Sequence, residues 1–248
     1  KQHDNFYMIE KQGSHEGYEQ NYSSLESFLC DIEGDVLFIV SGAGAISGCA
    51  LRLLEELRGN KTSVLYIKPE YDLLSARQKL RHRATFGILQ EYARSCLLER
   101  LYVVDNTALE SIIKDVPVLK YYDKLNDLIV STIPMCNVFK NSRSVMDTFS
   151  ENIETAKIST FGIVDMENDE EKMFYDLKIP REKCYYYAIN KKQLSSDGAL
   201  IRKIRKQIND MKKEGENSSV SYGVYGTEYE NNYVYVVANS TLIQEQSL

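Results

Sequence analysis

The sequence has no long hydrophobic run, and no stretch approaches the ~18 apolar residues that a membrane helix needs. No segment with the features of a secretory signal peptide opens the chain. Histidine is scarce, and the three that occur (His3, His15 and His82) match neither a catalytic triad nor metal-ligand spacing. These absences exclude a membrane-spanning protein and leave no predicted metal site.

Cysteine is present without the pattern that its specialised uses require. The five residues are odd in number and widely spaced, and no CxxC pair exists: Cys30, Cys49, Cys96, Cys136 and Cys184. Neither a zinc site nor a disulfide framework is indicated, so reduced cysteines and a cytoplasmic location are predicted. A net charge of −6 also argues against nucleic acid or an acidic membrane as the main partner.

With 248 residues, 27% of them charged and 43% hydrophobic, the chain is long enough for one large or two modest globular domains. The character of the sequence changes after Pro134. We therefore predict one domain over residues 1–134 and a smaller α+β domain over 135–248, with the boundary between residues 134 and 156. The chain begins with Lys1 rather than Met, so we expect residues to precede it.

One stretch organises the first domain. Residues 36–40 form a continuous apolar run, which predicts a strand buried on both faces. A glycine-rich turn follows (Gly42, Ala43, Gly44, Ala45, Ile46, Ser47 and Gly48), and then a helix over residues 46–57. Backbone N–H groups and a helix N-terminus would converge there, which suits an anion. A phosphate cradle and an ordinary tight strand-to-helix crossover both remain open.

Strands alternate with helices through the rest of the first domain. Strands are predicted at residues 6–9, 64–67 and 101–104, and helices at 23–32, 74–100, 108–114 and 121–133. This alternation predicts a mainly parallel sheet with right-handed crossovers. In the second domain the predicted strands cover residues 157–164, 184–189, 221–225 and 233–238, with an amphipathic helix at 197–213. That part is expected to form an antiparallel or mixed sheet.

Three polar residues follow the glycine turn in a suggestive order. Asn106 comes after a strand, and Tyr122 and Asn126 are four residues apart on the helix at 121–133, so they share a face. An aromatic ring can stack on a purine and an Asn amide can pair with its polar edge. The alternative is a buried helix with an incidental Tyr and a hydrogen-bonded Asn. Together with the glycine turn, the set resembles the tubulin/FtsZ superfamily, and the last strand is similar to that of short phage and plasmid tubulin-like proteins.

The resemblance implies an α/β fold, a parallel-sheet nucleotide-binding domain plus a smaller α+β domain. It places the phosphates on Gly42, Ala43, Gly44, Ala45, Ser47 and Gly48, where the family has GGGTGTG or GGGTGSG. The γ-phosphate loop would begin at Gly13, with Glu16 as an unfavourable charge beside phosphate. Arg77 falls where bacterial members place an Arg beside the nucleotide, although a solvated helix charge is an equal alternative. Asn106, Tyr122 and Asn126 would hold guanine.

Two departures from the family's sequence pattern concern the hydrolysis of GTP. The family's catalytic loop, Asn-x-Asp-x-x-Asp/Glu, would fall on residues 136–144, where Asn137 survives and Phe139 replaces the first acid. Between Asn137 and Asp147 the sequence contains no Asp or Glu, so we predict no catalytic residue. The family's first phosphate loop does not precede Lys1, and half of the phosphate site is absent if the chain starts there.

The function that the resemblance implies is a protein that binds GTP or GDP, with Mg²⁺ as a possible companion. It would assemble head to tail into filaments, with weakened or absent hydrolysis. Its partners would be further copies and other structural proteins, with no membrane or nucleic acid. One alternative is a degenerate scaffold component that turns over no nucleotide, phage-encoded and then virion-associated. A dinucleotide-binding enzyme is disfavoured because the second strand ends in Lys68 rather than an acid.

Overall fold

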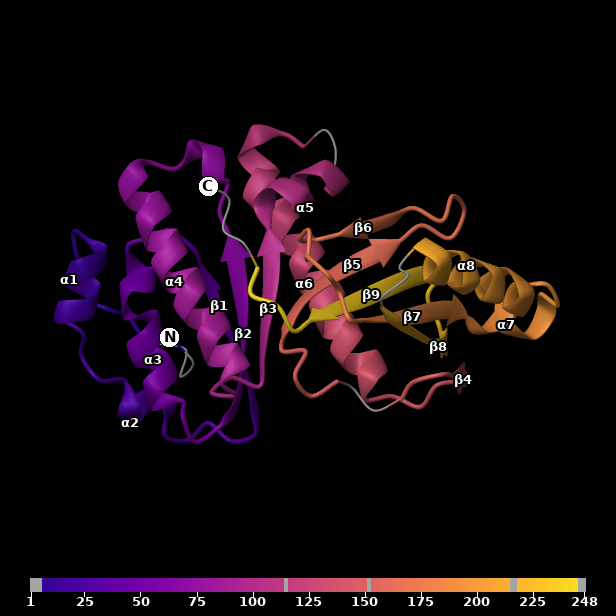
Figure 1. Cartoon of the computed structure of the whole chain (residues 1–248), viewed down its shortest axis with the longest axis horizontal. Helices are drawn as coiled ribbons and strands as arrows, with labels where there is room; N and C mark the ends of the chain where they lie inside the picture. Colours follow the sequence, from indigo (N-terminus) through magenta and orange to yellow (C-terminus); the bar gives the residue numbers. More distant parts are fainter. Residues whose placement is uncertain (1–5, 114–115, 151–152, 215–217, 245–248) are drawn as a thin grey trace. The chain divides into compact units, whose positions relative to one another are not determined.

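The computed structural model describes residues 6–113, 116–150, 153–214 and 218–244 (Figure 1). The chain divides into two compact units, residues 1–101 and 102–248. Among the described helices, none combines the length and apolarity that crossing a bilayer requires. His3 and Lys114, which entered the sequence predictions, lie outside the described residues.

The first unit is built on two parallel strands with helices around them. Its elements are α1 (His15–Gln20), α2 (Glu26–Leu29), β1 (Asp35–Ser41), the 3-10 helix η1 (Ile46–Cys49), α3 (Ala50–Glu56), β2 (Lys61–Lys68), the 3-10 helix η2 (Tyr71–Leu73) and α4 (Ala76–Arg94). β1 and β2 pair in parallel from Asp35 opposite Lys61 to Ser41 opposite Ile67. α4 packs on β2 through Phe86, whose ring stacks on that of Tyr66 at 5.1 Å.

The prediction that β1 is buried on both faces is wrong. Leu37 is 41% exposed and Ile39 is 58% exposed. Side chains alternate along a strand, so these two residues share the face opposite to Phe38 and Val40. Val40 lies opposite Tyr66, whose face α4 covers through Phe86. A continuous apolar run therefore does not require burial on both sides.

Three other predicted elements of the first unit differ from the structure. Residues 6–9 form no strand, and Phe6 and Met8 are 67% and 78% exposed. The helix predicted at residues 23–32 is shorter in the structure, where it covers Glu26–Leu29. α4 ends at Arg94 rather than near residue 100, because Cys96 takes a left-handed backbone conformation (φ 59°), a geometry that terminates helices.

The second unit contains a mixed sheet. β3 (Arg100–Asp105) begins in the first unit and ends in the second. The remaining elements are α5 (Asn106–Ile113), η3 (Val118–Lys120), α6 (Tyr121–Lys140), β4 (Met146–Asp147), β5 (Ile158–Val164), β6 (Glu171–Met173), β7 (Glu182–Asn190), α7 (Lys191–Ser196), α8 (Leu200–Glu214), β8 (Ser219–Thr227) and β9 (Tyr233–Ser240). The sheet of this unit runs β5-β9-β7-β8-β4, with β6 on β5. β7 and β8 are parallel and the other pairs are antiparallel.

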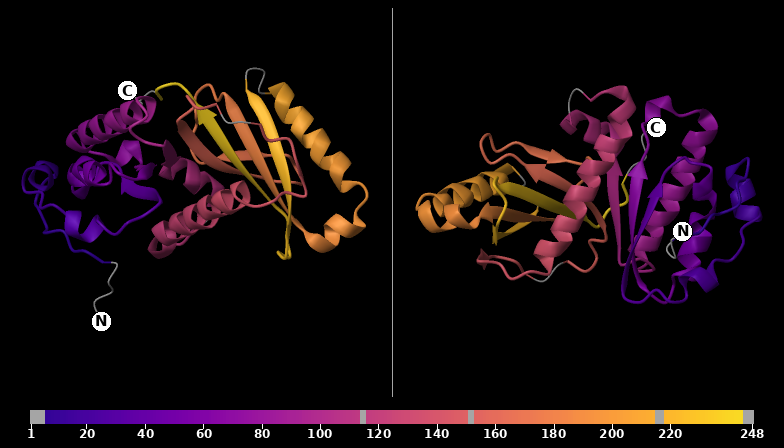
Figure 2. Two further views of the ribbon diagram at one scale, coloured as in Figure 1. Left: turned by 90° about the horizontal axis from the view of Figure 1, so that it is seen from below. Right: turned by 180° about the vertical axis from the view of Figure 1, so that it is seen from behind.

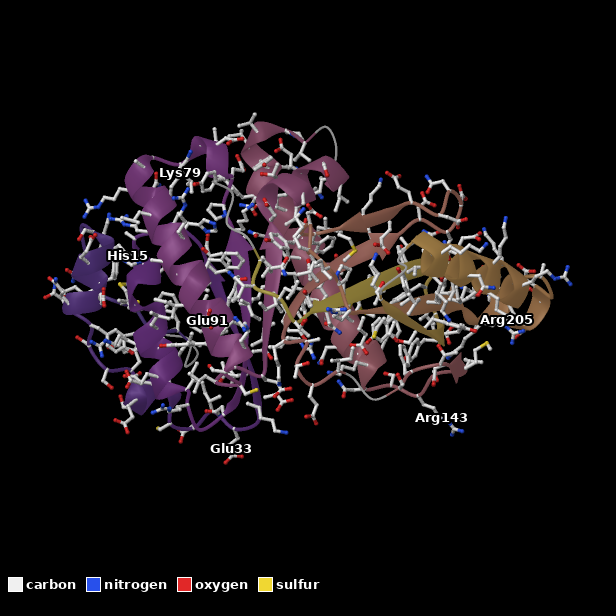
Figure 3. The ribbon with its side chains drawn as sticks, viewed as in Figure 1. His15, Glu33, Lys79, Glu91, Arg143 and Arg205 are labelled. Carbon is white, nitrogen blue, oxygen red and sulfur yellow. The ribbon has the colours of Figure 1, made fainter. Side chains whose placement is uncertain are left out.

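Both faces of this sheet are covered by helices (Figure 2). α8 buries Leu200, Ile204 and Ile208 against one face, together with alternate residues of β7, β8 and β9. On the other face, Phe139 of α6 packs against Tyr225 at 4.8 Å between ring centroids. The outward basic side chains of α8, such as Arg205, are exposed, in agreement with the amphipathic helix predicted at residues 197–213 (Figure 3). β8 and β9 follow one another in the chain, yet β7 lies between them.

α6 is longer than predicted, because it continues through Pro134 to Lys140. A proline inside a helix removes one backbone hydrogen bond and usually ends or kinks the helix. Here the residues beyond it are anchored: Cys136 and Phe139 are each 4% exposed. Their burial offsets the missing bond. The fold class predicted from the sequence is confirmed, while the domain boundary near residue 134 stays a prediction.

Candidate functional site

The glycine-rich turn, residues 42–48, follows β1 in the first unit, and its last three residues are the beginning of η1. A Cβ atom on Gly42 would lie 2.2 Å from the hydroxyl oxygen of Tyr66, and one on Gly48 would lie 2.1 Å from the backbone oxygen of His15. Both glycines are therefore required by packing. Gly44 differs, since a Cβ atom there would meet nothing within 4 Å. The open side of the turn, where an anion could approach the backbone, is at Gly44.

Two further residues shape the turn from inside. Ala43 takes a left-handed conformation at φ 64° and is 4% exposed. The Ser47 hydroxyl donates to the backbone oxygen of Gly44 at 2.7 Å, and Ser47 is 3% exposed. That hydroxyl, which the family resemblance places on phosphate, holds the turn together in this structure. The loop would therefore offer an anion its backbone N–H groups rather than this side chain.

The segment predicted as a γ-phosphate loop is the start of a helix. Gly13 is exposed, and Ser14 caps α1 by accepting a hydrogen bond from the Gly17 backbone N–H at 3.0 Å. His15, the first residue of α1, is the one that contacts Gly48. α1 thus lies directly against the end of the glycine-rich turn, so Gly13 and the turn belong to one region of the first unit.

Arg77 lies on the first turn of α4, and its partner is Glu16 of α1. Its Nη2 atom donates to Glu16 Oε2 at 2.8 Å, and Nη2 of Arg81 lies 3.6 Å from the same oxygen. The backbone N–H of Glu16, followed by the Arg77 guanidinium, lowers the pKa of Glu16 to about 2. The Arg77 side chain is 64% exposed and pairs with a carboxylate of the same chain, and its place beside a nucleotide stays a prediction.

Arg81 and His15 were not among the predicted site residues. Arg81 is one helical turn after Arg77, a spacing that could have indicated the pair. The Arg81 side chain is 14% exposed. Within the described part of the chain, its Nε atom and Nε2 of His15 are buried with no hydrogen-bond partner. Burial, and then the charge of Arg81, lowers the pKa of His15, so this ring is neutral at pH 7.

The predicted base-binding residues lie in the second unit. Asn106 is the first residue of α5, and the Asp105 carboxylate beside it accepts from the Thr107 backbone N–H at 2.9 Å. Tyr122 is 65% exposed, and Asn126 is exposed one turn later on α6. Both side chains are exposed, while Leu125 and Ile129 of the same helix are buried, so base binding and the alternative of a buried helix with an incidental Tyr both stay predictions. Their convergence with the glycine-rich turn stays a prediction.

The predicted catalytic loop is wrong in position. Residues 136–140 are the last turns of α6, so Asn137 and Phe139 are helical. Asn141 caps this end, with Nδ2 donating to the Asn137 backbone oxygen at 2.8 Å. The segment that actually leaves the helix, residues 141–145, contains Arg143 and no carboxylate (Figure 3). The next acid is Asp147 on β4, which accepts a hydrogen bond from the Ser144 hydroxyl.

The residues present suit a nucleotide in part. The open backbone at Gly44 fits a phosphate, and the exposed Tyr122 ring fits stacking on a base. Glu16 does not fit a phosphate while its carboxylate is ionised and held by arginines. Among the described residues, no three His, Cys, Asp or Glu side chains gather in a way that could hold a metal ion.

Comparisons with known proteins identify the fold. No family model matches the sequence, and no curated protein is similar to it in sequence. The structure is similar to an FtsZ dimer from M. jannaschii (TM-score 0.61, 11% identity, 91% of this chain and 68% of that one). It is similar to a GTPγS-form protofilament of TubZ from Bacillus thuringiensis serovar israelensis (0.61, 16%, 91% and 65%). It also resembles GDP-bound CetZ1 from Haloferax volcanii (0.61, 17%, 88% and 68%).

The chain therefore has the tubulin/FtsZ fold, at sequence identities that show the fold alone. It spans about two thirds of the length of the three structures.

Proposed function

We propose that this chain is a tubulin-like protein that binds a guanine nucleotide and assembles head to tail, with weak or absent GTP hydrolysis. The observation that carries the proposal is the fold itself, with an open backbone site at Gly44 in the turn between β1 and η1. Two of its structural neighbours contain guanine nucleotides or their analogues, and one of these is a protofilament.

The base-binding part of the proposal rests on Asn106, Tyr122 and Asn126. The exposure of Tyr122 and Asn126 on one face of α6 supports it, because stacking and amide pairing require accessible groups. Exposed large aromatic side chains on a helix are also a feature of interaction surfaces. The nucleotide class, GTP or GDP, follows from the resemblance and is proposed here with Mg²⁺ as its companion.

Weak hydrolysis is supported by the segment after α6. Water activation for phosphoryl transfer needs a well-placed group that positions or deprotonates the attacking water. Residues 141–145 contain no carboxylate, and Asp147 lies on β4, where the Ser144 hydroxyl donates to it. Head-to-tail contacts between identical subunits produce open filaments when the rotation does not close a ring. Filament formation therefore does not require hydrolysis.

A scaffold component without nucleotide is the second candidate, and two observations favour it. The Glu16 carboxylate pairs with Arg77 and Arg81. The Ser47 hydroxyl donates to the backbone oxygen of Gly44 within the same turn. Both contacts reduce what the first unit can offer to phosphate. A scaffold would keep the fold and its assembly surfaces while losing nucleotide affinity. Phage origin would be consistent with this candidate and stays a prediction.

Thermal unfolding of the protein with GTP, GDP and ATP separates the two candidates. We expect guanine nucleotides to raise the melting temperature, since a ligand that binds the folded state alone stabilises it. Asn126→Ala should abolish the rise. Ser131→Ala is the matched control, because Ser131 is exposed on the same helix and its hydroxyl donates to the backbone oxygen of Leu128 in that helix. Equal shifts with GTP and ATP, or none with any nucleotide, would exclude the nucleotide proposal.

Assembly and turnover are measured on the same protein. Negative-stain imaging and light scattering should detect filaments, with GTP if the first candidate holds and without nucleotide if the scaffold candidate holds. Phosphate release should stay low at all protein concentrations. Brisk release that rises with protein concentration would contradict weak hydrolysis and point to a carboxylate supplied by a neighbouring subunit.

A further inference from the structure

The first unit contains a cationic cluster beside the glycine-rich turn, which we call the Glu16 cluster (His15, Glu16, Arg77 and Arg81). All four residues come from two helices, α1 and α4. Both arginines approach one oxygen, Glu16 Oε2, at 2.8 Å and 3.6 Å. The carboxylate also takes a hydrogen bond from its own backbone N–H. Two guanidinium groups directed at one oxygen atom are donors of the kind that proteins use for phosphate.

The cluster has more donors than Glu16 satisfies. Within the described residues, Nε of Arg81 and Nε2 of His15 are buried without a partner. Buried polar atoms of this kind normally find a hydrogen bond, so each one calls for an explanation. The formal charge of the two arginines and the one carboxylate is also positive. An anion with more oxygens than a carboxylate would use both the spare donors and the spare charge.

The cluster adjoins the turn that the proposed function assigns to phosphates. The backbone oxygen of His15 contacts Gly48, and the His15 ring lies against the same glycine. An oxyanion that displaced the Glu16 carboxylate would therefore sit next to residues 42–48. The neutral His15 ring adds no charge there, and Nε2 is free to donate or accept according to its tautomer.

We propose that the Glu16 cluster is an oxyanion site for phosphate groups, and that Glu16 occupies it as an internal competitor. The side chain mimics the ligand, so the site is closed until the carboxylate is displaced or its charge is removed. For nucleotides, this predicts that the wild-type protein favours a diphosphate over a triphosphate, because the extra phosphate meets Glu16. That consequence rests on the proposed function, whereas the cluster itself does not.

Inorganic tripolyphosphate tests the site without a base. In calorimetric titrations at pH 7, Glu16→Gln should bind tripolyphosphate at least about tenfold more tightly than wild type, since a charge a few ångströms from the ligand is removed. Glu16→Gln combined with Arg81→Ala should lose this gain. Glu91→Gln is the matched control, an exposed acid on α4 whose partner is Arg94, and should bind as wild type does. Glu16→Ala provides a second variant, with folding checked by circular dichroism.

Two outcomes would overturn the proposal: folded Glu16 variants that bind tripolyphosphate no better than wild type, and a gain that survives loss of Arg81. The nucleotide titrations keep this result separate from the proposed function. If GDP protects wild type while tripolyphosphate binding does not rise in Glu16→Gln, the cluster proposal fails and the nucleotide proposal stands. If tripolyphosphate binding rises in Glu16→Gln and no nucleotide protects any variant, the cluster proposal stands and the nucleotide proposal fails.

Discussion

The backbone oxygen of His15 lies so close to Gly48 that a Cβ atom on that glycine would be 2.1 Å away. The contact ties α1 to the end of the glycine-rich turn and gives Gly48 a packing role. Gly44, four residues earlier, has no such neighbour within 4 Å. Two glycines of one turn thus serve different purposes, and a matched pair of substitutions separates them.

Gly48→Ala should lower the free energy of unfolding by about 1–3 kcal/mol, because the methyl group meets backbone and forces α1 or the turn to move. Gly44→Ala should leave that free energy unchanged or raise it by about 0.4–1 kcal/mol, through a less flexible unfolded chain. Urea unfolding of both variants measures the difference. Equal destabilisation would contradict the packing role assigned to Gly48. If residues 42–48 bind phosphate, Gly44→Ala should nevertheless lose nucleotide protection.

The contribution of Glu16 to stability should depend on pH. Its pKa is about 2 in the folded protein against 4.5 for an ordinary glutamate, so folding favours the ionised form. The stabilisation is complete above pH 4.5 and is lost as the pH falls toward 2. The melting temperature of wild type should therefore exceed that of Glu16→Gln slightly at neutral pH, and the two should converge in acid. A constant difference from pH 7 down to pH 2.5 would show that the carboxylate charge is not responsible.

In the second unit, a buried hydrogen bond links β7 to α8. The Tyr187 hydroxyl donates to Gln207 Oε1 at 2.7 Å, and the two residues are 0% and 3% exposed. Tyr187→Phe leaves the Gln207 oxygen without its donor, which should cost about 1–3 kcal/mol of unfolding free energy. Tyr229→Phe, at a tyrosine that is 38% exposed, is the comparison and should change stability by less than about 0.5 kcal/mol. Chemical denaturation of both proteins decides whether the bond matters.

Thiol reactivity should divide the cysteines by burial. Cys30 and Cys96 are exposed, whereas Cys49, Cys136 and Cys184 are buried. Burial raises the pKa of Cys136 to about 12, so almost no thiolate forms there at pH 8. A disulfide reagent should titrate two thiols quickly in the native protein and all five in denaturant. Rapid modification of Cys136 under native conditions would show that the second unit opens easily around α6.

Local pattern determined much of this protein. The alternation of strands and helices, the 3.6-residue periodicity of α8 and the strand-turn-helix unit at residues 35–57 follow from neighbouring residues, and each is in the structure. Those signals depend on steric preference and on which side chains share a face, which a sequence contains directly. The order of Asn106, Tyr122 and Asn126 was likewise enough to suggest the fold.

Tertiary structure decided what depends on distant partners. Phe139 and Cys136 find burial on the β-sheet, and this carries α6 past Pro134, where a local rule ends the helix. Leu37 and Ile39 are exposed although their strand is apolar throughout, since coverage depends on what packs against each face. Glu16 and Arg77 are 61 residues apart in the chain, and only the packing of α1 near α4 brings them into contact. Sequence patterns report local preference, whereas burial and ion pairing arise from contacts that the folded chain alone creates.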